Sequence, residues 1–201
     1  MSDEMVRFEA MLAEYAAADQ EARQEVRRRM WETYGRHCAV FVSDLSGFSR
    51  VSERLDIVHF LSIIHVCRRL LVPLVRESGG TLIKTAADNT YAVFPDARTA
   101  IETCIAMQLR VREHNAGVGP DDRIGLCVGI GHGDVLVVGD QDFFGHELNL
   151  AFKLGEDTAE SGEILVTRAA MESAGLERFP HEMRTISLSG VTIPHAAIRY
   201  G

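Results

Sequence analysis

The chain has 201 residues, 46% of them hydrophobic and 25% charged, a composition typical of a globular domain of about 150 residues with a short extension. Its 21 lysines and arginines against 29 aspartates and glutamates give a formal net charge of −8. This charge argues against nucleic-acid binding, which needs a cationic surface. A nucleotide is still a compatible ligand for an acidic protein where a metal ion screens the phosphates.

The first 36 residues form an N-terminal extension with its own composition, rich in Ala, Glu, Arg and Gln and without Pro. Four residues in it have a 3-4-3 spacing that places them on one helical face: Met5, Phe8, Leu12 and Tyr15. We therefore expect one or two helices over residues 1–36 and a main domain over residues 37–201. The extension packs on the main domain or pairs with another chain, because its apolar seam is too short for a full coiled coil.

The main domain alternates strands and helices along the chain. The predicted elements are a strand at 38–45, a helix at 57–75, strands at 81–85 and 90–94, a helix capped by Asp96, a strand at 123–133, a helix at 147–160, a strand at 163–166, a short helix and two final strands. Residues 86–89, between the second and third strands, are typical of a hairpin turn. The order β-α-β-β-α-β predicts an α+β fold with a ferredoxin-like sheet covered by helices.

The strand at 123–133 has two unlike faces. One face is apolar, whereas the other carries Gly125, Cys127 and Gly129. A face of such small residues indicates the close approach of another backbone or of a ligand. A glycine-tolerant strand that crosses a crowded sheet is the alternative interpretation.

Cysteines and histidines indicate no redox or zinc site. The four cysteines, Cys38, Cys67, Cys104 and Cys127, are far apart within apolar stretches and form no CxxC pair. We expect four buried, reduced thiols in a cytoplasmic protein. The eight histidines form no HxxxH pair. We also expect no membrane span and no export signal, because no apolar run approaches about 20 residues and the N-terminus is acidic.

Two acids stand where strands end. Asp44 directly follows an apolar strand, and Asp88 lies in the predicted hairpin turn. In a β-α-β-β sheet the first strand runs beside the hairpin, so its carboxyl end and the turn converge. Two carboxylates that meet repel each other unless a cation joins them, and oxygen ligands favour Mg²⁺ or Mn²⁺. Either acid alone is more simply a cap or turn residue, but together they predict a metal site.

Further groups near these acids suit a phosphate-bearing ligand. Two metal ions about 3.5–4 Å apart can activate an oxygen nucleophile and stabilise a leaving pyrophosphate. The loop from Ser46 to Ser49 would offer free backbone N–H groups to phosphates at the start of a helix. Lys84 lies in a strand among apolar neighbours, where a lysine is either an exposed edge residue or a specific hydrogen-bond donor.

Five features in order resemble the catalytic domain of class III nucleotidyl cyclases, the adenylate and guanylate cyclase family. They are FVSDLSGFS at 41–49, GGTLIK at 79–84, Asp88, FFGHELN at 143–149 and GEILV at 162–166. Each feature alone is weakly specific, but five in the family's order are strongly so. The resemblance covers roughly residues 38–200.

This resemblance implies an adenylate cyclase, which converts ATP to 3′,5′-cyclic AMP and pyrophosphate by two-metal-ion catalysis. Asp44 and Asp88 would hold two Mg²⁺ or Mn²⁺ ions. Lys84 and Asp142 would read the adenine base, and Asn149 would position the ribose. The loop after the first strand would contact the substrate through Leu45, Ser46, Gly47, Phe48 and Ser49.

The resemblance also implies a homodimer with shared sites, in which the metal aspartates of one chain face the base-reading residues of the other. The small residues Gly125 and Gly129 would then lie at the dimer groove.

Three positions depart from the family's pattern. Lys153 replaces the transition-state arginine that follows the asparagine by four residues, and Ser189 replaces a lysine that binds the triphosphate. Lysine keeps the charge of arginine but not the planar fork that grips two phosphate oxygens. Ala87 replaces a glycine before the second metal aspartate, which disturbs the hairpin if a positive φ is needed there. The first two departures predict weakened turnover and motivate an alternative, a non-catalytic cyclase homology module for nucleotide sensing or dimerisation.

Overall fold

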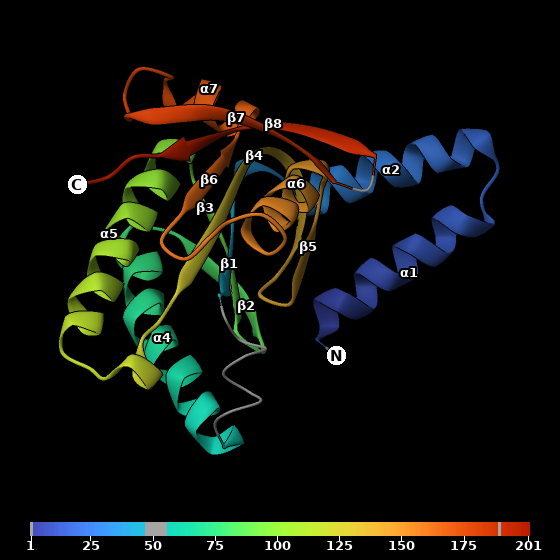
Figure 1. Cartoon of the computed structure of the whole chain (residues 1–201). Coiled ribbons are helices and arrows are strands. Elements are labelled where there is room, and N and C mark those ends of the chain that lie inside the picture. Colours follow the sequence, from blue (N-terminus) through green and yellow to red (C-terminus); the bar gives the residue numbers. More distant parts are fainter. Residues whose placement is uncertain (1, 47–55, 189) are drawn as a thin grey trace.

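A computed structural model describes residues 2–46, 56–188 and 190–201 (Figure 1). The chain begins with two helices, α1 (Asp3–Ala17) and α2 (Gln20–Tyr34). Each has a side-chain cap, since the Ser2 hydroxyl accepts from the Met5 N–H and the Asp19 carboxylate accepts from the Ala22 N–H. The extension packs on the main domain, because residues of both helices share an apolar cluster with a sheet strand: Phe8, Val26, Met30, Tyr34 and Val138.

The described strands form one twisted sheet. They are β1 (Gly35–Leu45), β2 (Thr81–Ala86), β3 (Asn89–Phe94), β4 (Leu126–Val138), β5 (Asp142–Phe144), β6 (Ile164–Thr167), β7 (His181–Leu188) and β8 (Val191–Ile198). Their order is β2-β3-β1-β4-β6-β8-β7, with β5 paired to β4. Each neighbouring pair in the row β2-β3-β1-β4 is antiparallel, which confirms the predicted ferredoxin-like arrangement. β1 begins three residues before the predicted start, and β4 continues five residues beyond the predicted end.

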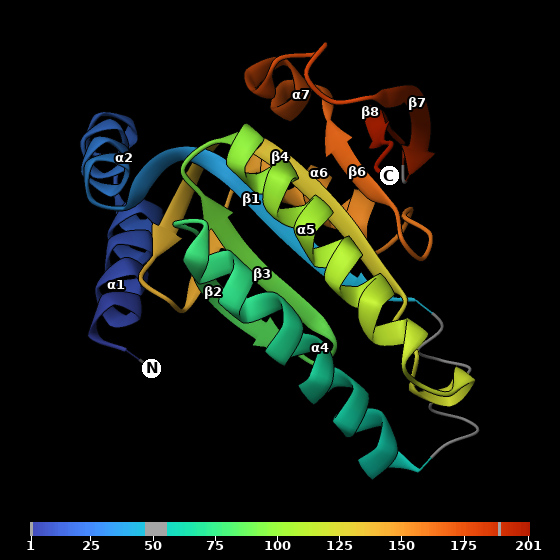
Figure 2. The same cartoon turned by 90° about the vertical axis from the view of Figure 1, so that its left-hand side faces the viewer.

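Helices cover both faces of this sheet. Figure 2 shows α4 (Ile57–Glu77) and α5 (Ala97–Ala116) along one face, with α6 (His146–Gly155) behind the sheet. The strand alternation sets this division, since Phe41 joins the core under α4 and α5 while Val40 and Val42 face the opposite side. The short helix α7 (Arg168–Ala174) follows β6, and a 3₁₀ turn (Pro120–Asp122) precedes β4. α6 ends at Gly155, five residues before the predicted end.

The small-residue face of the strand predicted at 123–133 packs closely on other segments of the same chain, with Gly129 against α6. A Cβ atom on Gly129 would collide with the Ala151 carbonyl oxygen and lie 2.6 Å from the Gly155 nitrogen. A Cβ atom on Gly125 would collide with the Ser46 hydroxyl. The close approach predicted from these glycines is therefore made within one chain. Their placement at a dimer groove is corrected, because α6 already fills the space over Gly129.

α4 packs one face on the sheet and also meets the length and hydropathy criterion for crossing a membrane, with a mean hydropathy of 1.6 in its most apolar window, of which 28% is buried. The expectation that no apolar run approaches that length is therefore wrong for this helix. Core helices of globular domains meet the same criterion, and α4 buries Phe60, Leu71 and Val75 against the sheet.

The expected burial of the four cysteines is confirmed, and all four are free thiols.

Candidate functional site

The predicted convergence of Asp44 and Asp88 is present in the structure. Asp44 is the last but one residue of β1, and Asp88 lies in the two-residue turn between β2 and β3. Because β1 pairs with β3, with Ser43 opposite Thr90, the end of β1 reaches this turn. Burial, the charge of Asp88 and a hydrogen bond between the two carboxyl groups raise the pKa of Asp44 to about 7, against the opposing effect of the Leu45 N–H.

The acid pair suits a hard divalent cation. Two carboxylates in contact at neutral pH repel each other, and a cation between them removes that repulsion. The described residues contain no group of three or more His, Cys, Asp or Glu side chains arranged for a metal, so protein side chains offer a small donor set. Mg²⁺ is commonly held by one or two carboxylates, with waters and substrate phosphates completing its shell. The residues present therefore fit Mg²⁺ or Mn²⁺ bound together with a nucleotide.

Glu156, directly after α6, is a third acid near the pair that the sequence analysis missed. Its carboxylate accepts from the Tyr91 hydroxyl at 3.1 Å and from the Asn89 amide. Burial, followed by the charges of Asp157 and Asp88, raises the pKa of Glu156 despite these two hydrogen bonds. One signal in the sequence could have pointed to it, since Asn149, Lys153 and Glu156 follow a 4-3 helical spacing.

The metal-free acid pair leads to a first prediction. The pKa of Asp44 is raised from its ordinary value of 3.8 to about 7. Between pH 3.8 and about 7, Asp44 is therefore protonated in the folded chain and ionised in the unfolded chain. This contribution to stability is complete below about pH 4 and is lost as the pH rises through about 7. We expect the free energy of unfolding of the metal-free protein to fall over that window, measured by urea titration, and the fall to shrink in Asp44→Asn. An equal slope in the two proteins would contradict the assignment.

Lys84 and Asp142 form an ion pair in a pocket beside α6. The Lys84 ammonium donates to Asp142 Oδ1 at 2.8 Å and lies 5.3 Å from the centre of the Tyr91 ring. Lys84 lies on the edge strand β2 and also donates a specific hydrogen bond to Asp142. The edge position and the donor role, which the sequence analysis gave as alternatives, are therefore both present. The pocket has a volume of about 270 Å³ and is lined by Lys84, Tyr91, Asp142, Phe143, Phe144, Leu148, Asn149 and Phe152. A slot with aromatic side chains, one cation and one anion suits a planar heteroaromatic ring.

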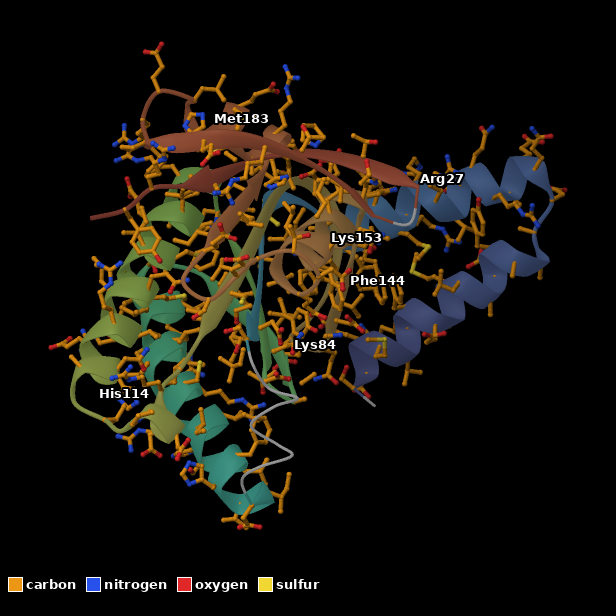
Figure 3. All side chains as sticks on the ribbon, viewed as in Figure 1. Arg27, Lys84, His114, Phe144, Lys153 and Met183 are labelled. Atoms are coloured by element: carbon orange, nitrogen blue, oxygen red, sulfur yellow. The ribbon has the colours of Figure 1, made fainter. Side chains whose placement is uncertain are left out.

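α6 presents the two remaining predicted side chains, four residues apart on one helical face. Asn149 is exposed and lines the pocket. Lys153 is half-buried in the last turn and forms no ion pair within the described residues, so its charge is available to an anionic ligand. Phe152 stacks on Tyr91 with ring centres 6.2 Å apart, which ties α6 to the strand beneath it. Figure 3 labels Lys84, Phe144 and Lys153, which come from β2, β5 and α6.

Lys84 and Lys153 are also the only lysines in the sequence.

The predicted phosphate loop is only partly described. Leu45 is buried at the end of β1. The Ser46 N–H donates to the Gly125 carbonyl at 2.7 Å, so the expectation of a free N–H for a phosphate is wrong for Ser46. Gly47, Phe48 and Ser49 lie outside the described residues, as does Ser189.

The N-terminal extension touches the wall of the pocket that holds Lys84 and Asp142. The Phe8 ring of α1 stacks on Phe144 with centres 5.4 Å apart and an interplanar angle of 2°. Phe144 belongs to β5, the strand that begins with Asp142. A larger cavity, of about 500 Å³, lies at the junction of the extension with the other end of the sheet, between residues such as Tyr34, Arg36 and Phe94. It contains none of the predicted site residues.

The turn that carries Asp88 is strained, which leads to a second prediction. Ala87 has φ +48° and is the only non-glycine residue with a positive φ among the described residues. This conformation costs a residue with a Cβ atom about 1–2 kcal/mol, more than the roughly 0.4–1 kcal/mol of unfolded-chain entropy that a glycine adds. We expect Ala87→Gly to raise the free energy of unfolding by about 1 kcal/mol, measured by urea titration. A less stable variant would show that the turn does not need this φ in solution.

Comparisons with known proteins point to one family. Residues 32–192 match a family model described as the adenylate and guanylate cyclase catalytic domain. A putative adenylate cyclase 3 of Rhizobium meliloti is 28% identical over 160 residues, which is 80% of this chain. An adenylate cyclase of Streptomyces coelicolor is 28% identical over 151 residues, or 71% of this chain. The chain spans 25% and 38% of the lengths of these two relatives.

Solved structures show the same fold. The crystal structure of the guanylyl cyclase Cya2 superposes with a TM-score of 0.72, over 82% of this chain and 92% of that one, at 23% sequence identity. At this identity the superposition establishes the architecture alone.

Proposed function

The chain belongs to the adenylate and guanylate cyclase catalytic domain family, and from this premise we propose that it is an adenylate cyclase, which converts ATP to 3′,5′-cyclic AMP and pyrophosphate. The observation that carries the proposal is the Lys84–Asp142 pair, held at 2.8 Å in an aromatic pocket that Asn149 also lines. Relatives named as adenylate cyclases support it, and they do not favour the non-catalytic alternative.

Lys84 and Asp142 carry complementary hydrogen-bonding capacity for adenine. A lysine only donates and an ionised aspartate only accepts. Adenine offers an acceptor at N1 and a donor on its 6-amino group, so Lys84 would donate to N1 and Asp142 would accept from the amino group. Guanine has a donor at N1–H and an acceptor at O6. In the same pose its N1–H would face the Lys84 donor and its O6 would face the Asp142 acceptor, so neither hydrogen bond could form. The Asp142 carboxylate also accepts from the Phe143 N–H at 2.9 Å, which fixes its orientation.

The acid pair and α6 would act on the ribose and the triphosphate. Asp44 and Asp88 would hold two Mg²⁺ or Mn²⁺ ions, which supply positive charge to the triphosphate when bound. The reaction forms a bond between the ribose 3′ oxygen and the α-phosphorus and breaks the bond from that phosphorus to the leaving pyrophosphate. Asn149 would hold the ribose by its amide, and Lys153 would place an unpaired ammonium near the transferring phosphoryl group.

We propose that the protein works as a homodimer with two shared sites, as the family resemblance implies. The acid pair of one chain would then face Lys84 and Asp142 of the other. Turnover would be weak, because Lys153 provides a point charge where the family's pattern has a planar bidentate donor.

Base selectivity tests the proposal. We expect kcat/KM for ATP to exceed that for GTP, with product identified by mass spectrometry. Lys84→Met should lower kcat/KM for ATP about 10- to 100-fold, the 1.5–3 kcal/mol of a hydrogen bond to a charged group. Arg98→Met is a matched control, because it removes one positive charge from an exposed pair with Glu102 on α5. Equal rates with ATP and GTP would contradict the assignment of Lys84 and Asp142 to adenine.

The rarity of lysine provides a binding assay that needs no turnover. With Lys84 and Lys153 as the only lysines, acetylation of the protein reports on the candidate site directly. ATP with Mn²⁺ should protect Lys84 from acetylation, as read from peptide masses. Unchanged labelling of Lys84 at saturating ATP would contradict its role in base recognition.

A further inference from the structure

The turn that presents Asp88 needs support from elsewhere in the fold. It joins β2 and β3 by two residues, Ala87 and Asp88, and Ala87 holds a φ of +48°. Two-residue hairpin turns with a positive φ at the first position favour glycine there, because a Cβ atom strains that conformation. In this chain the position before a candidate metal ligand is therefore occupied by a residue that does not favour the required backbone shape.

Arg68 of α4 contacts this turn directly. Its Nη2 donates to the Ala87 carbonyl oxygen at 2.6 Å. The neighbouring Cys67 is 3% exposed and Leu71 is fully buried, so this part of α4 is fixed against the sheet. The guanidinium therefore reaches the turn from a rigid element and restrains the peptide unit that follows the strained φ.

Arg68 makes this contact at an energetic cost. Its Nε is buried and has no hydrogen-bond partner within the described ranges 2–46, 56–188 and 190–201. A buried donor left without a partner lowers the stability of the folded state. An arginine with no role beyond a solvent-exposed helix position would turn its Nε–H to water, as the exposed neighbour Arg69 is free to do. The structure thus keeps the guanidinium at the turn although one of its donors is unsatisfied there.

We propose that Arg68 is a positioning residue for the candidate cation site, which holds the Ala87–Asp88 turn in the shape that presents the Asp88 carboxylate to Asp44. The inference rests on the proposed function in that it takes Asp44 and Asp88 as the cation ligands. The planar guanidinium bonds the carbonyl with a fixed geometry, whereas a lysine would supply one flexible donor. Arg68 thereby substitutes for the conformational freedom that a glycine at position 87 would bring.

The test measures Mn²⁺ binding without nucleotide, by the electron paramagnetic resonance signal of free Mn²⁺. Arg68→Met should raise the Mn²⁺ dissociation constant about 10-fold or more, as changes behind metal ligands do. Arg68→Lys should lose less. Arg69→Met is the matched control, since it removes the same charge from the exposed neighbouring position and should leave binding within about twofold.

A double variant separates positioning from a general effect on folding. Adding Ala87→Gly to Arg68→Met should recover most of the lost Mn²⁺ affinity, because glycine adopts the positive φ without support. Hydrogen exchange of the peptide that covers residues 82–92 should be faster in Arg68→Met than in Arg69→Met. If Arg68→Met does not fold, Arg68→Lys with and without Ala87→Gly gives the same comparison.

Three results would overturn the inference: wild-type Mn²⁺ affinity in both Arg68 variants, an equal loss in Arg69→Met, or no recovery with Ala87→Gly. A wild-type protein that binds no Mn²⁺ would overturn it as well. Failure of the proposed function looks different. In that case Mn²⁺ binding depends on Arg68 as described, but no cyclic AMP forms from ATP.

Discussion

Replacing Asp44 by asparagine is expected to lower cyclic AMP formation about 10²- to 10³-fold, the loss typical when one electrostatic group of an active site is removed. Asparagine has the size of aspartate but no negative charge, so the variant retains the shape of the β1 end and loses its affinity for a divalent cation. Cyclic AMP from ATP and Mn²⁺ is measured by mass spectrometry at matched protein concentrations.

The same substitution is expected to stabilise the metal-free fold at neutral pH. Burial and the neighbouring Asp88 charge make ionised Asp44 unfavourable in the folded chain, and asparagine removes that charge. Gain of stability with loss of activity separates a functional acid from a structural one. Asp134→Asn serves as the control, because Asp134 is an exposed carboxylate on β4 that pairs with His37. Retention of a tenth or more of wild-type activity in Asp44→Asn would contradict the cation site.

Replacing Lys153 by arginine is expected to raise kcat about 10- to 100-fold. A transition-state arginine contributes roughly 10³-fold or more in phosphoryl transfer. The expected gain is smaller because lysine already supplies the positive charge. Lys153 lies in the last turn of α6, four residues after Asn149, and has no acidic partner in the described part of the chain. An arginine there would grip two phosphate oxygens at once. Steady-state kinetics with ATP and Mn²⁺ measure the change.

The effect should appear in kcat more than in KM, because the added contacts form with the transferring phosphoryl group. Lys153→Met provides the opposite control and should lower kcat below that of the wild type. An unchanged kcat in Lys153→Arg would show that this position does not limit catalysis. The explanation of weak turnover by Lys153 would then be wrong.

Local patterns were sufficient to predict much of the fold. The β-branched run before Asp44, the helical spacing after Ile57 and the Asp96 cap each determine structure over a few residues, and each prediction is confirmed. The convergence of Asp44 and Asp88 followed from the strand order, which the alternation of elements already indicated. These features depend on short-range sequence and on general rules of topology.

Features that depend on contacts between distant segments could not be predicted. The early start of β1 includes the exposed Arg36 and His37, which carry no strand pattern and are in β1 because they pair with β4. The end of α6 precedes Glu156, whose carboxylate is bound by Asn89 and Tyr91 from β3. The glycines of β4 signalled a close approach, but the sequence did not identify α6 as the partner.

The positioning contact of Arg68 belongs to the same class. Arg68 and Ala87 are 19 residues apart, and their hydrogen bond exists only because α4 packs across β2. The sequence showed only the unusual alanine before Asp88. A departure from a family's pattern at one position thus identified a place at which to look for a compensating contact elsewhere in the fold.

The most direct test of the central claim is to incubate the purified protein with ATP and Mn²⁺ and to analyse the products by mass spectrometry. We expect 3′,5′-cyclic AMP and pyrophosphate in equal amounts, formed slowly by the wild type and about 10²- to 10³-fold more slowly by Asp44→Asn. If ATP protects Lys84 from acetylation but no cyclic AMP forms, the assignment as an active adenylate cyclase is contradicted and the chain is a nucleotide-binding module.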